Sequence, residues 1–159
     1  MLSQVERLIL ETDGRYARDV ELQFLETYAQ SYALRLRVYR KLQAIEARIV
    51  QDVYQQLRSH DPALLMRGDH DLSAKWKQDT IRVLRYVSVA VLTGDTETFH
   101  ERFLLWFQTI MRAFNAQRSC DATYLVMQEV MQRHLAPDEA SLVLPVLELT
   151  RSTLSAVAA

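Results

Sequence analysis

Residues 72–95 read LSAKWKQDTIRVLRYVSVAVLTGD, and their pattern is helical. Apolar side chains recur along one face of a helix at Leu72, Trp76, Val83, Val87 and from Ala90 to Leu92. Gly94 follows the last of them, where a glycine can take the left-handed conformation that ends a helix. The stretch therefore predicts a helix over 72–93 with one buried face.

The composition of the whole chain agrees with a helical fold. The 159 residues are 49% apolar and 25% charged, with a formal net charge of -1, as expected for one soluble globular domain. Three glycines and three prolines are too few turn residues for a sandwich or barrel of many short strands. A near-zero charge without a basic tail also argues against a nucleic-acid partner. We expect one all-α domain over residues 1–159.

Upstream of residue 72, two amphipathic patterns predict helices. One covers 2–11, and a much longer one starts near Leu22 and continues to Val53 without a glycine or proline. Two helices that meet near Ala44 would fit this longer pattern equally well. Asp61 and Pro62 have the residue types of a helix start, and residues 66–71 have those of a loop.

Downstream of Gly94, three more helices are predicted. Asp95 or Thr96 caps a helix that reaches Phe114 and is apolar around most of its circumference, so we expect it to be buried on several sides. Ser119 begins the next helix. Pro137 begins the last one, which Pro145 should kink or split. The chain should thus contain about seven helices.

The single cysteine and the absence of long apolar runs limit the compartment and the chemistry. Cys120 alone cannot form an internal disulfide or a cysteine-only metal site. No apolar run approaches the ~20 residues of a membrane span, and the first 15 residues carry acidic side chains that a signal peptide lacks. No glycine-rich phosphate loop, HExxH or GxSxG motif occurs. We therefore expect a non-enzymatic cytoplasmic protein that is not inserted into a membrane.

Several blocks of the sequence, in the same order, resemble those of one known family. They are Glu11-Thr-Asp13-Gly-Arg15, then Arg35-Leu36 with Leu42 and Ile49-Val50, then Asp79 with Arg85-Tyr86 and Ala90-Val-Leu-Thr-Gly94-Asp95, and finally Arg102. This succession is similar to that of the phycobiliproteins, the light-harvesting subunits of cyanobacterial antennae. The resemblance covers essentially the whole chain.

The resemblance implies a globin-like phycobiliprotein fold. Two extra N-terminal helices would lie in residues 1–18 and serve dimerisation, and residues 19–159 would form the globin-like core. In the family, an aspartate and an arginine at the positions of Asp13 and Arg85 pair across the contact between two subunits. A homodimer that buries apolar residues of its N-terminal helices is therefore implied, at Leu8, Ile9, Phe24 and Leu25. The alternative is a surface aspartate and a solvated arginine.

Two positions depart from the family, and the first of them bears on function. The cysteine that forms the thioether to the bilin is replaced by Trp76, and the arginine beside the following aspartate is replaced by Gln78. The aspartate that contacts the pyrrole nitrogens in the family is kept as Asp79. Because tryptophan offers no thiolate, a bilin cannot be attached covalently at the usual site.

A tetrapyrrole held without a covalent bond, either haem or bilin, remains compatible with these residues. The predicted pocket is formed by residues of the helix around Asp79 and of the loop before it. These residues are His70, Lys75, Trp76, Lys77, Asp79 and Arg82. His70 and His100 are the candidate ligands of a haem iron, although each also fits a solvated surface histidine. The three cationic side chains, Lys75, Lys77 and Arg82, would also be explained by an ordinary charged helix face. Asp69-His70-Asp71 has metal-ligand residue types, but a solvated loop explains it better.

Three functions remain open at this point. The first is a homodimer that binds a tetrapyrrole noncovalently or not at all. The second is a pigment-free module that associates with phycobilisome subunits or with their assembly and degradation factors. The third, a globin-like sensor domain, agrees less well with the family-like N-terminal block.

Overall fold

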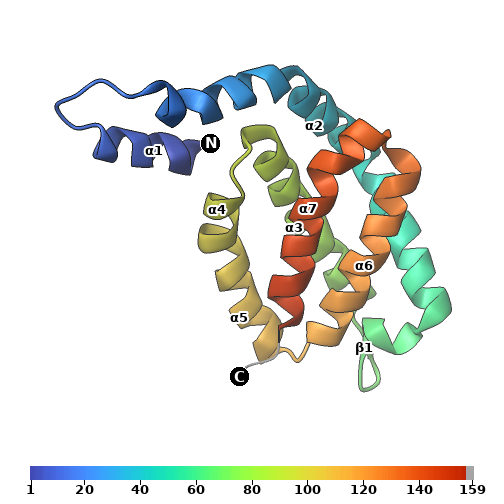
Figure 1. Cartoon of the computed structure of the whole chain (residues 1–159). Coiled ribbons are helices and arrows are strands. Elements are labelled where there is room, and N and C mark those ends of the chain that lie inside the picture. The colour runs from blue at the N-terminus through green and yellow to red at the C-terminus, as the bar shows by residue number, and fades with distance from the viewer. Residues whose placement is uncertain (157–159) are drawn as a thin grey trace.

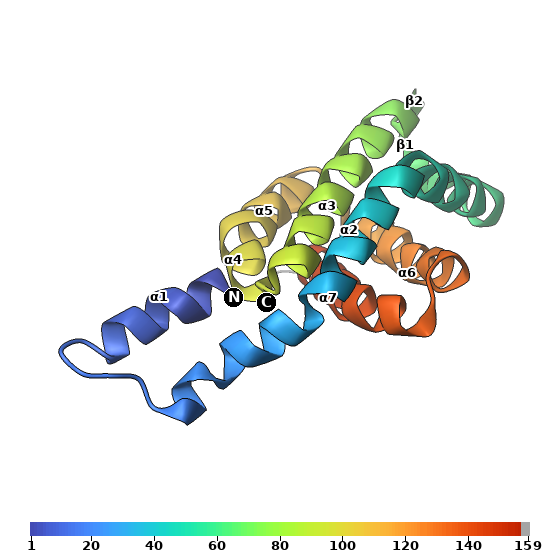
Figure 2. The same ribbon diagram turned by 90° about the horizontal axis from the view of Figure 1, so that it is seen from above.

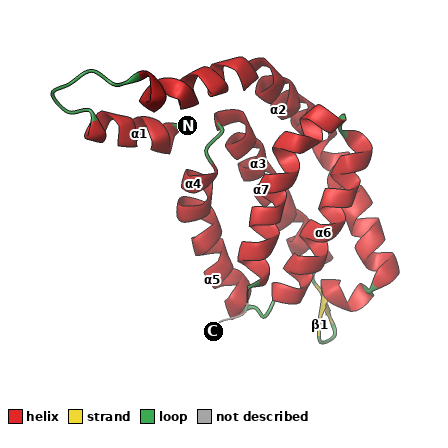
Figure 3. Cartoon of the chain, viewed as in Figure 1, coloured by secondary structure: helices red, strands yellow, loops and turns green. Residues whose placement is uncertain are grey.

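Helices make up almost all of the described chain, which is residues 1–156 of a computed structural model (Figure 3). The α-helices are α1 (Leu2–Glu11), α2 (Asp19–His60), α3 (Ser73–Thr93), α4 (Thr96–Phe99), α5 (Leu105–Ala113), α6 (Gln117–His134) and α7 (Pro137–Ser155). A 3₁₀ turn, η1 (Pro62–Leu65), follows α2, and a π-helical turn, η2 (His100–Leu104), joins α4 to α5. The predicted all-α class is confirmed.

An arm formed by α1 and the first part of α2, residues 2–37, projects from the other helices (Figures 1 and 2). No residue of α1 is buried, and the buried residues of α2 begin at Val38. At its base the arm is held by Ser3, whose backbone N–H and hydroxyl donate to the Asp95 carboxylate at 2.8 and 2.9 Å. Residues 1–18 contain one helix and a turn instead of the two helices expected there, because the second N-terminal segment is continuous with α2.

The second part of α2 packs with α3, α6 and α7 around the core. The largest fully buried side chains of this core include one from each of the four helices: Leu42, Leu84, Met127 and Leu147. The predicted alternative of a break near Ala44 is wrong, since α2 runs unbroken for 42 residues. Ala44 lies on the exposed side, while Leu42 and Ile49 keep the buried face continuous past it.

The carboxyl end of α3 is fixed by the arm. Gly94 ends the helix with φ of 60°, as predicted. The Arg35 guanidinium donates to the Val91 carbonyl at 2.7 Å, and the Tyr28 hydroxyl donates to the Leu92 carbonyl at 3.0 Å. These donors satisfy carbonyls that the helix itself leaves unpaired. A Cβ at position 94 would approach both side chains to 3.3 Å.

Three local expectations differ from the structure. Residues 66–71 form a small antiparallel hairpin of two strands, β1 (Met66–Arg67) and β2 (His70–Asp71), instead of an irregular loop. The helical segment up to Phe114 is exposed on one side, where Trp106 and Phe114 are 53% and 55% exposed, because no other helix of the described chain covers them. Helix α7 is not split at Pro145, which lies on its exposed face.

Candidate functional site

A cavity of about 440 Å³ lies between the hairpin, α3, the end of α5 and the start of α6. Most of its lining is apolar or aromatic, including Leu65, Leu72, Phe107, Ile110, Met111 and Phe114. Its polar lining consists of Lys75, Asp79, Thr80, Asn115, Ser119 and Thr123, together with two arginines described below. A volume of this size with a few polar groups is typical of small-molecule sites.

Trp76 forms part of one wall. Its indole N–H donates to the Thr123 hydroxyl of α6 at 2.9 Å, and its ring lies 6.0 Å from the ring of Tyr54 on α2. The indole is thus held between two neighbouring helices at the position expected for a cysteine. A thioether cannot form there.

Asp79 lies on the same wall, one helical turn after Lys75. The Lys75 ammonium donates to both Asp79 carboxylate oxygens, at 2.6 and 2.8 Å. Both side chains line the cavity. A ligand N–H that bonds to Asp79 therefore has to share this carboxylate with Lys75.

Two ionisable groups on α6 face the cavity in neutral form. Cys120 is 7% exposed, and burial, with smaller contributions from Asp79 and Asp121, raises the pKa of its thiol to about 12. Burial likewise raises the pKa of Tyr124 well above its ordinary value. Both groups are protonated at neutral pH, so neither is an anionic ligand or, for Cys120, a ready nucleophile.

Two arginines at the cavity were not predicted from the sequence. Arg67 comes from β1 and lies over the ring of Phe114, 5.4 Å from its centroid. Arg118 comes from the first turn of α6 and pairs with Asp61 at 2.6 Å. Arg118 is far in sequence from α3, and Arg67 lies in the segment just before α3, where only the pairing of β1 with β2 brings its side chain to the cavity.

Of the six predicted pocket residues, the structure brings Lys75, Trp76 and Asp79 together at the cavity. Lys77 points to α2, where its ammonium lies 4.3 Å from the Tyr54 ring centroid and 3.3 Å from the Gln51 amide oxygen. Arg82 is exposed on α3 and does not line the cavity.

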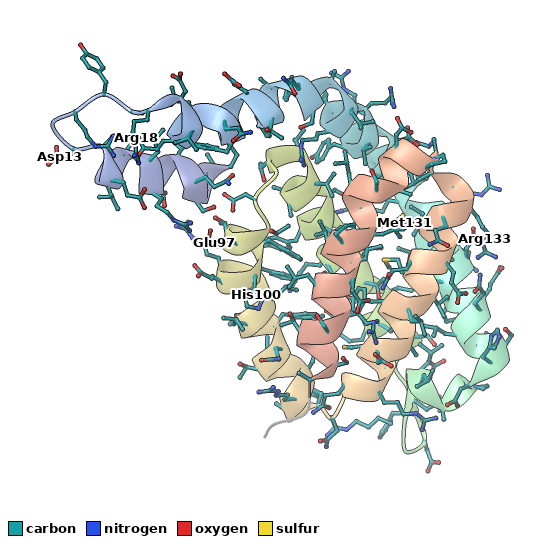
Figure 4. All side chains as sticks on the ribbon, in the orientation of Figure 1. Asp13, Arg18, Glu97, His100, Met131 and Arg133 are labelled. Atoms are coloured by element: carbon teal, nitrogen blue, oxygen red, sulfur yellow. The ribbon has the colours of Figure 1, made fainter. Side chains whose placement is uncertain are left out.

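The two candidate haem ligands are not part of this lining either. His70 is exposed on β2, and His100 begins η2 on a separate helical segment (Figure 4). Within residues 1–156, no group of three or more His, Cys, Asp or Glu side chains is placed to hold a metal ion. Asp69, His70 and Asp71 are accordingly solvated hairpin residues.

The two predicted interface residues lie in different parts of the molecule, Asp13 in the arm and Arg85 on α3. Asp13 is exposed in the turn at the tip of the arm (Figure 4). Arg85 lies on α3, and its guanidinium pairs with both carboxylate oxygens of Glu46 on α2 at 2.8 Å. Within one chain the two residues are not in contact, so a pair between them requires a second subunit.

Residues 8–154 match the model of the phycobilisome protein family. The chain belongs to this family. Membership agrees with the globin-like all-α arrangement of the helices, and the expectation drawn from the resemblance is confirmed at the level of family and fold.

Two relatives are similar over much of the chain. The beta subunit of C-phycocyanin-2 from Pseudanabaena tenuis is 27% identical over 110 residues, which are 65% of this chain and 64% of that subunit, slightly under two thirds of its length. Allophycocyanin subunit beta-18 from Aglaothamnion neglectum is 21% identical over 135 residues, covering 82% of this chain and 79% of that protein. Among the described residues, no helix is long and apolar enough to cross a membrane.

The cavity residues of this family member do not fit a covalently attached bilin. The wall of α3 carries Trp76, whose indole is engaged by Thr123, and Cys120 on α6 is a buried, protonated thiol. The lining does have the chemistry that noncovalent contacts to a tetrapyrrole would use, since it combines apolar side chains with one carboxylate and several cations.

Proposed function

We propose that this chain is a non-enzymatic, phycobilisome-related protein that binds a tetrapyrrole noncovalently. The observation that carries the proposal is the cavity along α3, where Asp79 and an apolar lining are retained while Trp76 stands in place of the attachment cysteine. A bound tetrapyrrole would supply visible absorption. The protein would hold it, shield it from water and place the Asp79 carboxylate next to its pyrrole nitrogens. We place the protein in the cytoplasm, in agreement with its free thiol at Cys120.

A bilin agrees with the lining better than haem. Haem iron is usually held by histidine, thiolate, methionine or tyrosine, and neither His70 nor His100 lines the cavity. Cys120 and Tyr124 line it, but their raised pKa values keep both protonated. Met66 and Met111 also line it, but methionine holds haem iron together with a histidine, which the lining lacks. A bilin needs no axial ligand, so the absence of a histidine from the lining is no obstacle to it.

The proposed assembly is a homodimer formed through the arm. Apolar side chains of the arm are unusually exposed for a soluble chain, with Ile9 at 65%, Leu10 at 79% and Val20 at 69%. In the proposed dimer, Asp13 of one copy would approach Arg85 of the other copy. That guanidinium would then give up its pair with Glu46 or bind both carboxylates. Such a charge pair orients an interface more than it adds affinity.

A second candidate function is a pigment-free module that uses the arm to associate with phycobilisome subunits or with factors for their assembly or degradation. The Lys75–Asp79 pair favours it, since the carboxylate already has a partner in the absence of a pigment. The exposed arm is required by both candidates. The cavity is required only by the first, and it is the feature to test.

The test is reconstitution of the purified protein with biliverdin and, separately, with haemin. We expect a red-shifted bilin absorption that follows the protein through gel filtration and is lost from the chain after denaturation, as noncovalent binding requires. Ser119→Trp, which adds bulk to the cavity wall on α6, should abolish this absorption. Gln132→Trp is the matched control, because it adds the same side chain to an exposed position of the same helix.

Two results would contradict the tetrapyrrole proposal. One is wild-type protein that stays colourless with both compounds, which would leave the interaction module as the better candidate. The other is equal binding by Ser119→Trp and Gln132→Trp, which would place any bound pigment outside the cavity.

A further inference from the structure

The lining of the cavity carries a concentration of positive charge that α3 alone does not provide. The lining contains three cationic side chains, Arg67, Lys75 and Arg118, and a single carboxylate, Asp79. They come from three elements, β1, α3 and α6. The cavity thus combines an apolar interior with cations on more than one wall, which suits an apolar molecule with acidic groups.

The three cations differ in what they already contact. Lys75 is engaged by Asp79, and Arg118 by Asp61. Arg67 has the ring of Phe114 beneath its guanidinium, and within residues 1–156 no carboxylate lies within ion-pairing distance of it. A guanidinium that rests on an aromatic ring keeps its N–H donors free for a planar carboxylate. Arg67 is therefore the cation best able to accept a new anion.

We propose that Arg67 and Arg118 form a binding site for the propionate carboxylates of the tetrapyrrole, which assigns this role to the hairpin and α6 instead of α3. The proposal rests on the proposed function and specifies the chemistry of its ligand as an acidic tetrapyrrole. Arg118 is held in place by Asp61, while Arg67 would turn from Phe114 to the carboxylate or bind it while still stacked.

The cations of α3 that lie outside the cavity provide the contrast. Lys77 is directed to Tyr54 and Gln51, and Arg82 is exposed on α3 and does not line the cavity. If general positive charge near α3 attracted the ligand, these residues would matter as much as the two arginines. If the carboxylates bind to Arg67 and Arg118, substitution of Lys77 or Arg82 should not change the affinity.

The experiment compares biliverdin with its dimethyl ester, in which both carboxylates are neutralised and the ring system is unchanged. Each is titrated into the full chain, and binding is followed by bilin absorption. Wild-type protein should bind the diacid about tenfold more tightly than the diester, a factor in keeping with one charge-assisted contact. Arg67→Met/Arg118→Met should bind both with the affinity of the diester, whereas Arg82→Met should keep the wild-type preference.

Asp61→Asn provides a check that does not remove an arginine. It frees Arg118 from its carboxylate partner while the side-chain oxygen that caps η1 is retained, so the preference for the diacid should be kept or increased. Equal binding of diacid and diester by the wild type would overturn the carboxylate site while leaving noncovalent tetrapyrrole binding intact. A full preference in Arg67→Met/Arg118→Met would also overturn it. Failure of both compounds to bind would overturn the proposed function itself.

Discussion

The two halves of α2 show how one continuous helix can be stabilised in two ways. Residues 19–37 contain no buried side chain, whereas residues 38–60 contain six: Val38, Leu42, Ile49, Val50, Val53 and Leu57. The second half is held by apolar packing with α3 and α6. Because a helix gains little stability from propensity alone, the first half depends on its ends, its polar contacts and whatever covers it.

Polar contacts hold the first half at both of its ends. At its start, the Arg18 backbone N–H donates to Glu21 at 2.7 Å, and Arg15 and Arg18 pair with the same carboxylate. The hydrogen bonds from Arg15 and Arg18 hold the pKa of Glu21 well below its ordinary value. Further along, Tyr28 and Arg35 reach the end of α3. We therefore predict that the core folds without the arm and that the proposed second copy covers the arm.

The largest expected effect tests the buried half. Leu42→Ala removes a side chain that is 1% exposed and should lower the free energy of unfolding by about 2–5 kcal/mol, because it leaves a cavity in the core. Val20→Ala, at a position 69% exposed in the arm, should change it by less than about 0.5 kcal/mol. Urea unfolding of the two variants gives the comparison. Similar losses would show that the two halves are stabilised alike.

The second effect tests whether a partner covers the arm. Leu10→Asp introduces a charge on a side chain that is 79% exposed, so it should leave the fold of the chain intact but raise the dimer dissociation constant more than tenfold. Analytical ultracentrifugation measures the dissociation constant. Asp13→Arg should weaken the dimer in the same direction, by reversing one member of the proposed charge pair.

Leu125→Asp is the matched control for the arm, since Leu125 is 49% exposed on α6. It should leave the dimer unchanged. A dimer that resists Leu10→Asp but dissociates with Leu125→Asp would move the interface from the arm to the core.

The smallest effect concerns the joint between arm and core, at Asp95. Burial raises the pKa of this carboxyl, but hydrogen bonds from Ser3 and Thr98 lower it more, so it lies well below the ordinary value of 3.8. The charged form is the one that holds α1. Its contribution is therefore complete above about pH 3.8 and is lost as the pH falls towards the lowered value.

Amide hydrogen exchange in residues 2–11 measures this joint. Asp95→Asn should reduce the protection of these amides at neutral pH by an amount equivalent to about 1 kcal/mol. It should also abolish the loss of protection that the wild type shows as Asp95 is protonated. Glu97→Gln alters the exposed pair with Arg7 and should have a smaller effect. Unchanged exchange in Asp95→Asn would show that the arm is held by other contacts.

Local sequence signals predicted some helices accurately. The spacing of Val5, Leu8 and Ile9, followed by Asp13-Gly14, gave α1 with its observed bounds, and Gly94 correctly marked the end of α3. Periodicity could not show that the aromatic side of α5 lacks a covering helix, because burial depends on which elements are neighbours. For the same reason it could not predict that Pro145 would face solvent and leave α7 unsplit.

The candidate site was predictable only where it lies on one helix. Lys75, Trp76 and Asp79 follow one another on α3 and were expected together. Arg67, Arg118 and Cys120 reach the same cavity from a hairpin and from α6, and only the fold brings them near Asp79. Cys120 is a buried thiol whose raised pKa keeps it protonated, although it lines the cavity.

Trp76 also gives the protein a built-in optical signal. Its indole lies in the cavity wall and is fixed by Thr123, whereas Trp106, the other tryptophan, is 53% exposed on α5. The two rings therefore emit from different surroundings, and a bound molecule that absorbs near their emission would quench the fluorescence of the ring in the cavity wall. The residue that rules out a thioether on α3 thereby makes occupancy of the cavity readable by fluorescence, without any added label.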